Sequence, residues 1–230
     1  TRLELVHPAD GRRLVLEAPL PGAFHVPDEE GRRVQAALAL RRLLLEPGGT
    51  DAFRLIHREG DGFPLLTVDR LGAWLYAEDF GDDAAVAAAF LERLAHTLGD
   101  VRGIILGRAA RGQRREDKRL VAGRPPPVDF TVMENGVRFH LDLLAPGGTG
   151  LFLDQRENRR RLMRLAEGRT VLNLFAYTCG FSVAAARGGA AETVSVDLSR
   201  RALEWGKRNF EANALEPARH RFLARDTAAA

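Results

Sequence analysis

The sequence predicts an α/β fold for its C-terminal part, preceded by a small α+β domain. After the segment "APGGTG", helical and strand-like stretches alternate, which is typical of a parallel sheet with crossover helices. Before it, strand-like runs surround a single Ala-rich helical stretch. With 230 residues the chain is long enough for one or two domains. We divide it into four regions, residues 1–28, 29–47, 48–145 and 146–230.

The first two regions precede the small domain. Residues 1–28 contain the alternating stretches "LELV" and "RLVLEAPL", which predict two short strands before a Pro-rich break. Residues 29–47 place Val34, Leu38 and Leu45 at helical spacing, and "PGG" then ends the pattern. We interpret residues 29–47 as a connecting helix and residues 1–28 as too short for a domain.

The small α+β domain is predicted over residues 48–145. The runs "FRLIHRE", "PLLTVDR" and "AWLYAEDF" are strand-like, and the helical stretch "DDAAVAAAFLERLAHTLG" and the strand-like "VRGIILGR" follow them. The polar "RGQRREDKR" predicts an exposed loop and "GRPPP" a linker. The region ends in a hairpin, "VDFTVMENGVRFHLDLL", whose Asn135-Gly136 pair suits a type I′ turn.

The α/β region, residues 146–230, alternates strictly. Helices are predicted at "DQRENRRRLMRLAEG", "FSVAAARG" and "SRRALEWGKRNFEANA", and strands at "TVLNLF", "TVSVD" and "RHRFLARD". We expect these elements to form the N-terminal half of a parallel-sheet domain, because the chain ends soon after the third strand.

Composition narrows the class of protein. A single cysteine, Cys179, allows no internal disulfide and no cysteine-based metal cluster, which agrees with a reducing compartment. No apolar run approaches the roughly 20 residues that a membrane span needs, and the first residues lack the features of a secretory signal. We therefore expect a cytoplasmic protein with no membrane partner and no metal.

The charge is compatible with a nucleic-acid partner. The net charge is +3 and the isoelectric point is near 9.6, and phosphates attract basic surfaces. Almost all of the 34 basic residues are Arg, in a chain also rich in Ala, Leu and Gly. A genome-wide compositional bias would produce the same pattern, so charge alone leaves the partner open.

The turn "NLFAYTCGF", residues 173–181, follows the first strand of the predicted parallel sheet, where such sheets bind ligands. A dinucleotide fingerprint places three glycines here, but this turn has only Gly180, which disfavours NAD and FAD. Asp197 ends the next strand, where a carboxylate can accept hydrogen bonds from ribose hydroxyls. Asp226 would end the third strand and receive the amine of adenine. S-adenosylmethionine, with a free ribose and no phosphate, fits this pattern, although both aspartates could instead cap helices.

Three stretches carry a family resemblance: "GLFLDQRENRR", "VLNLFAYTCGFSVAAA" and "VSVDLSRRALEWGKRNFEANAL". Together they resemble the large-subunit ribosomal RNA methyltransferases that make 5-methylcytosine or N2-methylguanine. The resemblance begins at "TDAFRLIHREGDGFPLLTVDRLG" and covers most of the chain. It implies a Rossmann-like class I methyltransferase domain behind a small, RNA-binding α+β domain of strand-strand-helix-strand-strand type. Residues 1–28 look too short for the PUA domain that often precedes these two domains.

The resemblance also implies site residues, with S-adenosylmethionine as cofactor and ribosomal RNA as partner. Residues of the turn would line the methionine end of the cofactor, Asp197 would bind the ribose, and Asp226 the adenine. We leave Asn209 and Asn213 as residues of a helix face. The implied cofactor-binding residues are Gln155, Arg156, Asn173, Phe175, Tyr177, Gly180, Asp197 and Asp226.

The start of the helix after "GLFL" has two interpretations. Asp154 and Glu157 have the spacing of a capping box, which explains both without a ligand. Gln155 and Arg156 lie in a stretch that closes over the cofactor in the resembling family. We hypothesise that the Arg156 guanidinium binds the methionine carboxylate, as its fork geometry allows.

The basic side chains supply candidate RNA contacts. Arg156, Arg160 and Arg164 are spaced four apart, so they could equally form a solvated stripe that faces RNA phosphates. The polar loop near residue 114 is a second candidate. The predicted RNA-binding residues are Arg111, Arg114, Arg115 and Arg160.

The sequence assigns no catalytic residue. Formation of 5-methylcytosine requires a cysteine nucleophile, but Cys179 lies inside the cofactor turn, so we interpret it as a packing residue. The chain ends before the Asp-Pro-Pro-type motif with which the resembling family methylates its base. The modified atom and the oligomeric state therefore stay open. A non-catalytic RNA-binding module, a small-molecule methyltransferase and, less favoured, an NAD-dependent oxidoreductase are the alternatives.

Overall fold

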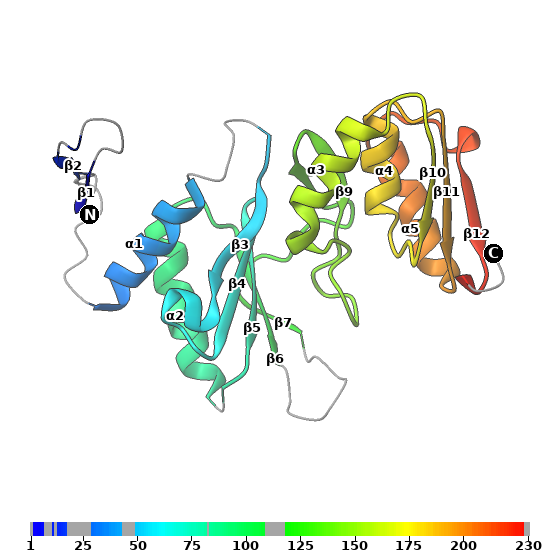
Figure 1. Cartoon of the computed structure of the whole chain (residues 1–230). Helices are drawn as coiled ribbons and strands as arrows, with labels where there is room; N and C mark the ends of the chain where they lie inside the picture. Colours follow the sequence, from blue (N-terminus) through cyan, green and yellow to red (C-terminus); the bar gives the residue numbers. More distant parts are fainter. Residues whose placement is uncertain are drawn as a thin grey trace.

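The computed structural model arranges the chain as a series of separate layers (Figure 1). A short N-terminal hairpin comes first, followed by a five-stranded sheet with two helices, a second hairpin, and a three-stranded parallel sheet with its own helices. The structure describes residues 2–6, 11, 13–17, 29–42, 49–81, 83–108 and 118–227.

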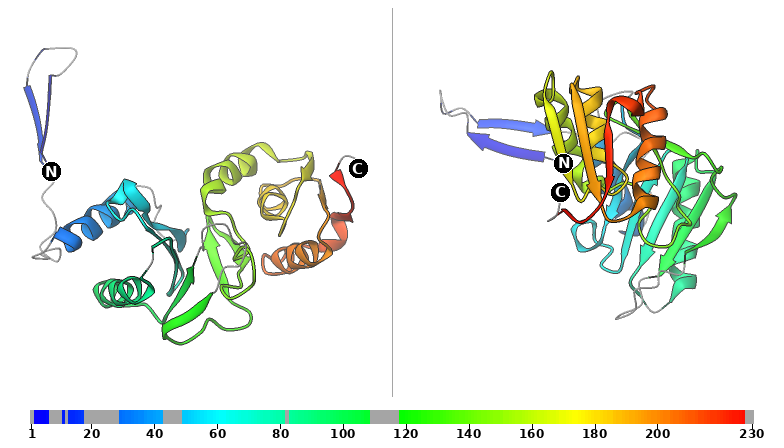
Figure 2. Two further views of the ribbon diagram at one scale, coloured as in Figure 1. Left: turned by 90° about the horizontal axis from the view of Figure 1, so that it is seen from below. Right: turned by 90° about the vertical axis from the view of Figure 1, so that its right-hand side faces the viewer.

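The N-terminal elements match the predicted pattern. Strands β1 (Arg2–Val6) and β2 (Arg13–Glu17) pair antiparallel, with Leu3 opposite Leu16. Figure 2 shows this hairpin projecting away from the rest of the chain. Helix α1 (Glu29–Arg42) lies within the predicted connecting helix and buries Val34 against the central sheet.

The central sheet has the strand order β3-β4-β5-β6-β7. Only β5 and β6 are parallel, because helix α2 carries the chain from the end of one to the start of the other. The side chain of Asp83 caps α2 by accepting hydrogen bonds from the N–H groups of Ala85 and Val86, and Gly99 ends the helix in a left-handed conformation. The elements are β3 (Ala52–His57), η2 (Arg58–Asp61), β4 (Leu66–Leu71), β5 (Trp74–Asp79), α2 (Ala84–Leu98), β6 (Gly103–Arg108) and β7 (Arg119–Gly123).

Strand β7 was not predicted. Its sequence, "RLVAG", lies between the Arg-rich loop and the prolines, and it runs along the edge of the sheet with largely exposed side chains. An edge strand of this kind does not need the alternation of apolar and polar residues by which buried strands are recognised. Its pairing with β6 comes from the tertiary structure alone.

The two faces of the central sheet have different partners. Helices α1 and α2 cover one face with a core that includes Leu55, Leu75 and Phe90. On the opposite face, Trp74 packs edge-on against Phe130, with 4.9 Å between the ring centroids. That apolar contact fills only part of the second face, and the remainder is polar.

The second hairpin forms at the predicted turn. Strands β8 (Thr131–Glu134) and β9 (Val137–His140) pair antiparallel around Asn135 and Gly136. Both turn residues have positive φ angles, 50° and 75°, which confirms the type I′ turn. The hairpin shares its core with both neighbours, because Phe139 packs in the cluster that joins Trp74 to Phe210.

The C-terminal sheet is parallel, with the order β10-β11-β12. Figures 1 and 2 show its helices on one side of the sheet. Among the described residues the other side is not covered, and Leu172 and Leu174 of β10 are exposed there. The α/β prediction is therefore confirmed. The elements are η3 (Leu153–Gln155), α3 (Arg156–Leu165), β10 (Thr170–Leu174), α4 (Gly180–Arg187), β11 (Glu192–Asp197), α5 (Arg200–Glu211), η4 (Pro217–Arg219) and β12 (Arg221–Ala224).

The predicted capping box at the start of α3 is wrong. Asp154 lies in the 3-10 turn η3, and the residue that precedes the helix is Gln155, whose side chain makes no capping hydrogen bond. The N-cap position is therefore Gln155, one residue later than predicted, so Asp154 and Glu157 no longer have the N-cap and N3 positions. Asp154 instead accepts a hydrogen bond of 3.0 Å from the Gln155 amide.

Candidate functional site

The turn between β10 and α4 has an unusual backbone. Phe175, Tyr177 and Cys179 all have positive φ angles, 55°, 48° and 60°, which residues other than glycine seldom adopt. Ala176 and Thr178 separate them. Strain of this kind persists only where surrounding contacts hold it, and it concentrates at functional sites.

Asp197 provides the strongest of those contacts. Its Oδ2 accepts a hydrogen bond of 2.8 Å from the Tyr177 N–H, and its Oδ1 accepts one of 2.8 Å from the Ser199 N–H. The helix cap is Ser199, whose hydroxyl accepts from the Ala202 N–H, so Asp197 lies two residues before the N-cap position. Each carboxylate oxygen has a second lone pair. Asp197 therefore holds the turn and keeps acceptor capacity for a ligand.

Exposed aromatic and aliphatic side chains surround this carboxylate. Phe175 is 77% exposed, and Leu198, which follows Asp197, is 74% exposed. Phe152 is also exposed, and its ring lies 5.4 Å from that of Tyr177. Large apolar side chains that gather at the end of a parallel sheet mark a ligand site.

Asn173 lies in β10 beneath the turn. Its amide donates a hydrogen bond of 2.9 Å to the Ser182 hydroxyl, which is 2.7 Å from the hydroxyl of Ser195. This polar chain joins β10, α4 and β11. Gly180, the first residue of α4, is buried, and a side chain there would meet Leu151 at an ordinary contact distance of 3.6 Å.

Cys179 lies inside the turn with no solvent exposure. Burial raises the pKa of its thiol to about 12. A side chain at Gly206 would collide with its sulfur, so α5 packs directly against the thiol. A thiol without exposure and with a raised pKa is not an activated nucleophile, which agrees with a packing role.

Sequence reasoning missed the contacts of α5 with the second hairpin. Trp205, Asn209 and Asn213 are spaced four apart and face the free edge of β9. The Asn213 amide bonds both the N–H and the carbonyl of Arg138, at 2.8 and 2.7 Å. Asn209 accepts from the His140 N–H at 2.8 Å, and Trp205 donates to the His140 carbonyl at 2.9 Å. The regular spacing of one indole and two amides is the signal that could have revealed it.

Asn209 also reaches the turn. Its amide donates to the Thr178 carbonyl at 2.9 Å, and the Thr178 hydroxyl donates to the Gly150 carbonyl at 2.6 Å. Asn209 and Thr178 are both buried. The turn, the hairpin and the segment before η3 are thus held together by Thr178 and by Asn209, which sequence reasoning left as a residue of a helix face.

The remaining predicted residues lie around this centre. The Gln155 side chain bonds Asp154 and Asn158, and Arg160 forms an ion pair of 2.8 Å with Glu157. Asp226 is exposed just after β12. Arg111, Arg114 and Arg115 lie outside the described residues.

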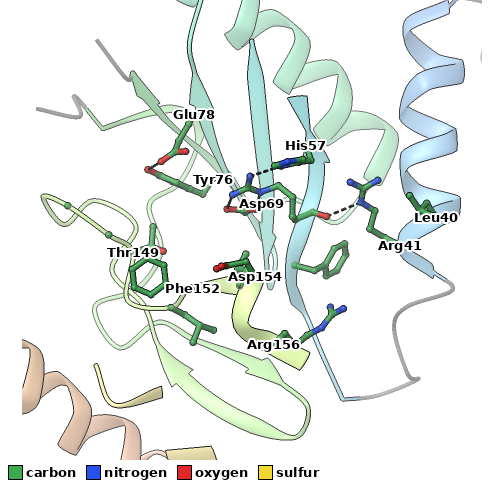
Figure 3. A pocket seen from close by; sticks show the side chains of 16 residues that line it. Leu40, Arg41, His57, Asp69, Tyr76, Glu78, Thr149, Phe152, Asp154 and Arg156 are labelled. Atoms are coloured by element: carbon green, nitrogen blue, oxygen red, sulfur yellow. Dashed lines mark hydrogen bonds and ion pairs between the residues drawn. The ribbon is translucent and has the colours of Figure 1, made fainter. Parts of the chain in front are cut away.

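A cleft of about 640 Å³ lies between the central sheet and the segment from Gly147 to Arg156 (Figure 3). Arg156 lines this cleft, and its Nε is 3.4 Å from a Glu157 oxygen. The carboxylate-binding role of Arg156 stays a prediction. The cleft is lined by Leu40, Arg41, Phe53, Arg54, His57, Asp69, Tyr76, Glu78, Gly147, Gly148, Thr149, Leu151, Phe152, Leu153, Asp154 and Arg156.

Arg54 is the centre of the charged side chains in the cleft. It binds both carboxylate oxygens of Asp69, and one of its nitrogens lies 3.3 Å from His57 Nδ1. Burial raises the pKa of Asp69 to about 6, although Arg54 opposes the shift. Burial lowers the pKa of Arg54, but the Asp69 carboxylate, and to a smaller extent those of Glu78 and Asp154, raise it above its ordinary value.

Comparison with known proteins assigns the family. Residues 93–229, more than half of the chain, match the model of the S-adenosylmethionine-dependent methyltransferases. The chain belongs to this family. Within the methyltransferase, the matched segment contains the strained turn, Asp197 and the whole parallel sheet.

Two curated relatives are similar to the methyltransferase described here. A ribosomal RNA large subunit methyltransferase of Deinococcus radiodurans is 37% identical over 209 residues, which cover 84% of this chain and 50% of the relative. Ribosomal RNA large subunit methyltransferase I of Shigella boydii is 35% identical over 199 residues, which cover 85% and 50%. The chain spans about half the length of these relatives.

A solved structure supports the Rossmann-like fold. A methyltransferase in complex with S-adenosylhomocysteine (SAH) superposes with a TM-score of 0.78 at 30% identity, over 89% of this chain and 54% of the other. No described helix is long and apolar enough to cross a membrane. Within the described ranges, no three His, Cys, Asp or Glu side chains are grouped to hold a metal ion.

Proposed function

We propose that this chain forms the cofactor-binding part of an RNA methyltransferase that acts on large-subunit ribosomal RNA, at cytosine C5 or guanine N2. Membership of the methyltransferase family and the similarity to two ribosomal RNA large subunit methyltransferases support this proposal. The observation that carries it is the Asp197 carboxylate, tied at the end of β11 to the strained turn after β10.

The residues present fit S-adenosylmethionine better than a dinucleotide. The side chains of Ala176, Tyr177 and Thr178 occupy the positions where a pyrophosphate needs close backbone approach. Asp197 retains lone pairs for two ribose hydroxyls after it binds the two backbone N–H groups. When bound, the cofactor supplies the methyl group from its sulfonium.

We assign the other site residues by their position around Asp197. Phe175, Tyr177 and Gly180 would contact the methionine end of the cofactor. Asn173 would support the site from beneath the turn, because its amide donates a hydrogen bond to Ser182 near the start of α4. Asp226 would accept the adenine amine, and Gln155 and Arg156 would close the site from α3.

The RNA-binding assignment rests on charge. Arg160 lies on α3, is partly exposed and shares its guanidinium with Glu157. Arg111, Arg114 and Arg115, outside the described residues, remain candidates through the polar loop between β6 and β7. Contacts with phosphates weaken as salt rises, because bound counterions are released on binding.

Calorimetric titration with S-adenosylmethionine tests the cofactor site. We expect saturable binding that weakens about tenfold or more in Asp197→Asn, because a charge-assisted acceptor for the ribose is lost. Ser199→Ala is the matched control. It removes the N-cap of α5, which costs about 1 kcal/mol of stability, but leaves the Asp197 carboxylate in place. NAD should not bind.

Three results of these titrations would each contradict a different part of the proposal. Equal affinity in Asp197→Asn and the unaltered chain would refute the ribose role. A folded chain without measurable cofactor binding that still binds RNA would favour a non-catalytic RNA-binding module. Cofactor binding without RNA binding would favour a small-molecule acceptor.

A further inference from the structure

The polar part of the central sheet, together with η3, forms the cleft of Figure 3, which lies outside the cofactor turn. Clefts of this size at the boundary between two parts of a protein, with aromatic walls and a few convergent polar groups, are where ligands bind. Its chemistry follows from three features: how its side chains are aligned, which charges are already paired, and which hydrogen-bond acceptors remain open.

A β-bulge aligns the polar side chains. The register of β3 against β4 shifts between Arg54 and Ile56, which places one extra residue in β3. Arg54 and His57 therefore point to the same face, although an unbroken strand would turn them to opposite faces. The contact of 3.3 Å between them confirms this direction.

The sheet register then builds two polar rows across the strands. Arg54 lies opposite Asp69, and Asp69 lies opposite Tyr76. In the second row, His57 lies opposite Thr67, Thr67 opposite Glu78, and Glu78 opposite Gly107. Together the two rows form one continuous polar surface on the cleft side of the sheet.

The cations in the cleft are already matched by carboxylates. Arg41 is held by both oxygens of Asp61, at 2.6 and 2.5 Å, and Arg54 is held by Asp69. The third arginine of the lining, Arg156, has its Nε 3.4 Å from a Glu157 oxygen. Glu78 and Asp154 add two more carboxylates close enough to raise the pKa of Arg54. A phosphate near Arg54 would meet no surplus of positive charge, so this part of the cleft selects against anions.

Two carboxylates keep open acceptor positions. The hydroxyls of Tyr76 and Thr67 lie 3.3 and 3.5 Å from the two Glu78 oxygens, well beyond the roughly 2.5–2.7 Å of a strong hydrogen bond to a carboxylate. Only the Oδ2 of Asp154 accepts from the Gln155 amide. A neutral ligand with N–H donors complements these groups, and cytosine N4 is a known donor to Glu and Asp side chains.

The walls of the cleft suit a planar ring and connect it with the cofactor turn. Phe53, Tyr76 and Phe152 line it. The Phe152 ring contacts that of Tyr177, whose backbone N–H binds Asp197. Unpaired bases are recognised by stacking on aromatic side chains and by hydrogen bonds to their edges.

From these features we propose that the cleft binds one unpaired, amine-bearing nucleobase of the RNA substrate, with Glu78 and Asp154 accepting hydrogen bonds from its edge. This inference rests on the proposed RNA-methylating function. We place the bound base next to the methylated one, because Phe152 lines the cleft and also contacts Tyr177 of the cofactor turn. The phosphates of the RNA stay outside the cleft.

Two single-stranded RNA octamers test the inference with the whole 230-residue chain. Oligocytidine carries an exocyclic amine on every base, whereas oligouridine has the same phosphates and no such amine. By fluorescence anisotropy, we expect oligocytidine to bind about fivefold or more tightly than oligouridine. Glu78→Gln and Asp154→Asn should each bring this ratio towards one, with little change for oligouridine.

The control variant is Glu204→Gln, which removes the same charge from the exposed face of α5 and should leave the ratio unchanged. Circular dichroism verifies that each variant is folded. Glu78→Gln is expected to fold, because its amide oxygen can accept from one of the two hydroxyls and its amide N–H can donate to the oxygen of the other.

Several outcomes would overturn the inference. These are equal affinity for the two octamers, a ratio that Glu78→Gln does not change, or no RNA binding at all. Octalysine that binds more tightly than oligocytidine, and loses this affinity in Glu78→Gln, would assign the cleft to a basic protein partner. A parallel titration with S-adenosylmethionine separates the two proposals: if the cofactor still binds, only the cleft assignment fails.

Discussion

Arg159 of α3 binds Glu134 of the second hairpin through two hydrogen bonds of 2.6 and 2.7 Å, and both side chains are at most 3% exposed. The guanidinium also donates to the Phe152 carbonyl at 2.7 Å. This bidentate pair fixes the hairpin against α3 and holds the segment that carries Phe152. The pair therefore has a structural role, because it positions the segment with Phe152 beside the candidate site.

Removal of one partner of this pair should destabilise the protein strongly. Arg159→Met leaves a buried, unpaired carboxylate, and we expect a loss of about 3–5 kcal/mol in the free energy of unfolding, measured with urea. The double variant with Glu134→Leu should recover most of the loss. Lys207→Met, which breaks an exposed pair with Glu204, should cost less than about 1 kcal/mol. Similar losses in the two single variants would contradict the role of burial.

The amide of Asn213 substitutes for a neighbouring strand along β9. Asn213→Ala should free the N–H of Arg138, and we expect faster hydrogen exchange at that amide and a loss of about 1–2 kcal/mol in stability. Asn158→Ala, which removes an amide from the surface of α3, is the control. Unchanged protection of Arg138 would show that the side chain is dispensable there.

Asp69 should make stability fall as the pH rises from about 4 to 6. Its pKa is raised to about 6 in the folded protein, against about 3.9 unfolded, so the folded state holds the proton more tightly in this range. Its contribution, roughly 3 kcal/mol, is complete below pH 4 and lost above pH 6. Because other carboxylates act in the opposite direction, the test is the difference between the native chain and Asp69→Asn in urea unfolding. Parallel pH profiles of the two proteins would refute it.

Arg156 and Arg160, one turn apart on α3, should have separable effects. We expect Arg156→Ala to weaken S-adenosylmethionine binding about tenfold, through loss of a charge-assisted hydrogen bond to the carboxylate. Arg160→Ala should leave cofactor affinity unchanged and reduce by about one the slope of log affinity for RNA against log salt. If Arg156→Ala instead weakens only RNA binding, the carboxylate-binding role of Arg156 is refuted.

Cys179 should be unreactive in the native protein. It is the single cysteine, its thiol is buried and its pKa is raised to about 12, so the thiolate fraction at pH 7.5 is very small. We expect Ellman's reagent to label one thiol per chain only after denaturant is added. Rapid labelling of the folded protein would reopen a chemical role for this residue.

The sequence by itself determined the features that depend on local order. The alternation of helices and strands after residue 146 predicted the parallel sheet, and Asn135-Gly136 predicted a type I′ turn, because backbone conformation there follows from neighbouring residues. The same holds for the turn at residues 173–181 and for Asp197, since both follow directly from strand ends. The family resemblance, which the comparisons confirm, supplied the cofactor.

Only the tertiary structure decided which distant residues meet. Glu134 and Arg159 are 25 residues apart in sequence, and Asn213 is 75 residues from Arg138, so no local pattern pairs them. The polar cleft depends on a bulge that turns His57 to the side of Arg54, a shift of one residue that alternation cannot reveal. Contacts of this kind depend on the packing of whole elements, and packing is fixed by the complete chain and not by any one segment of it.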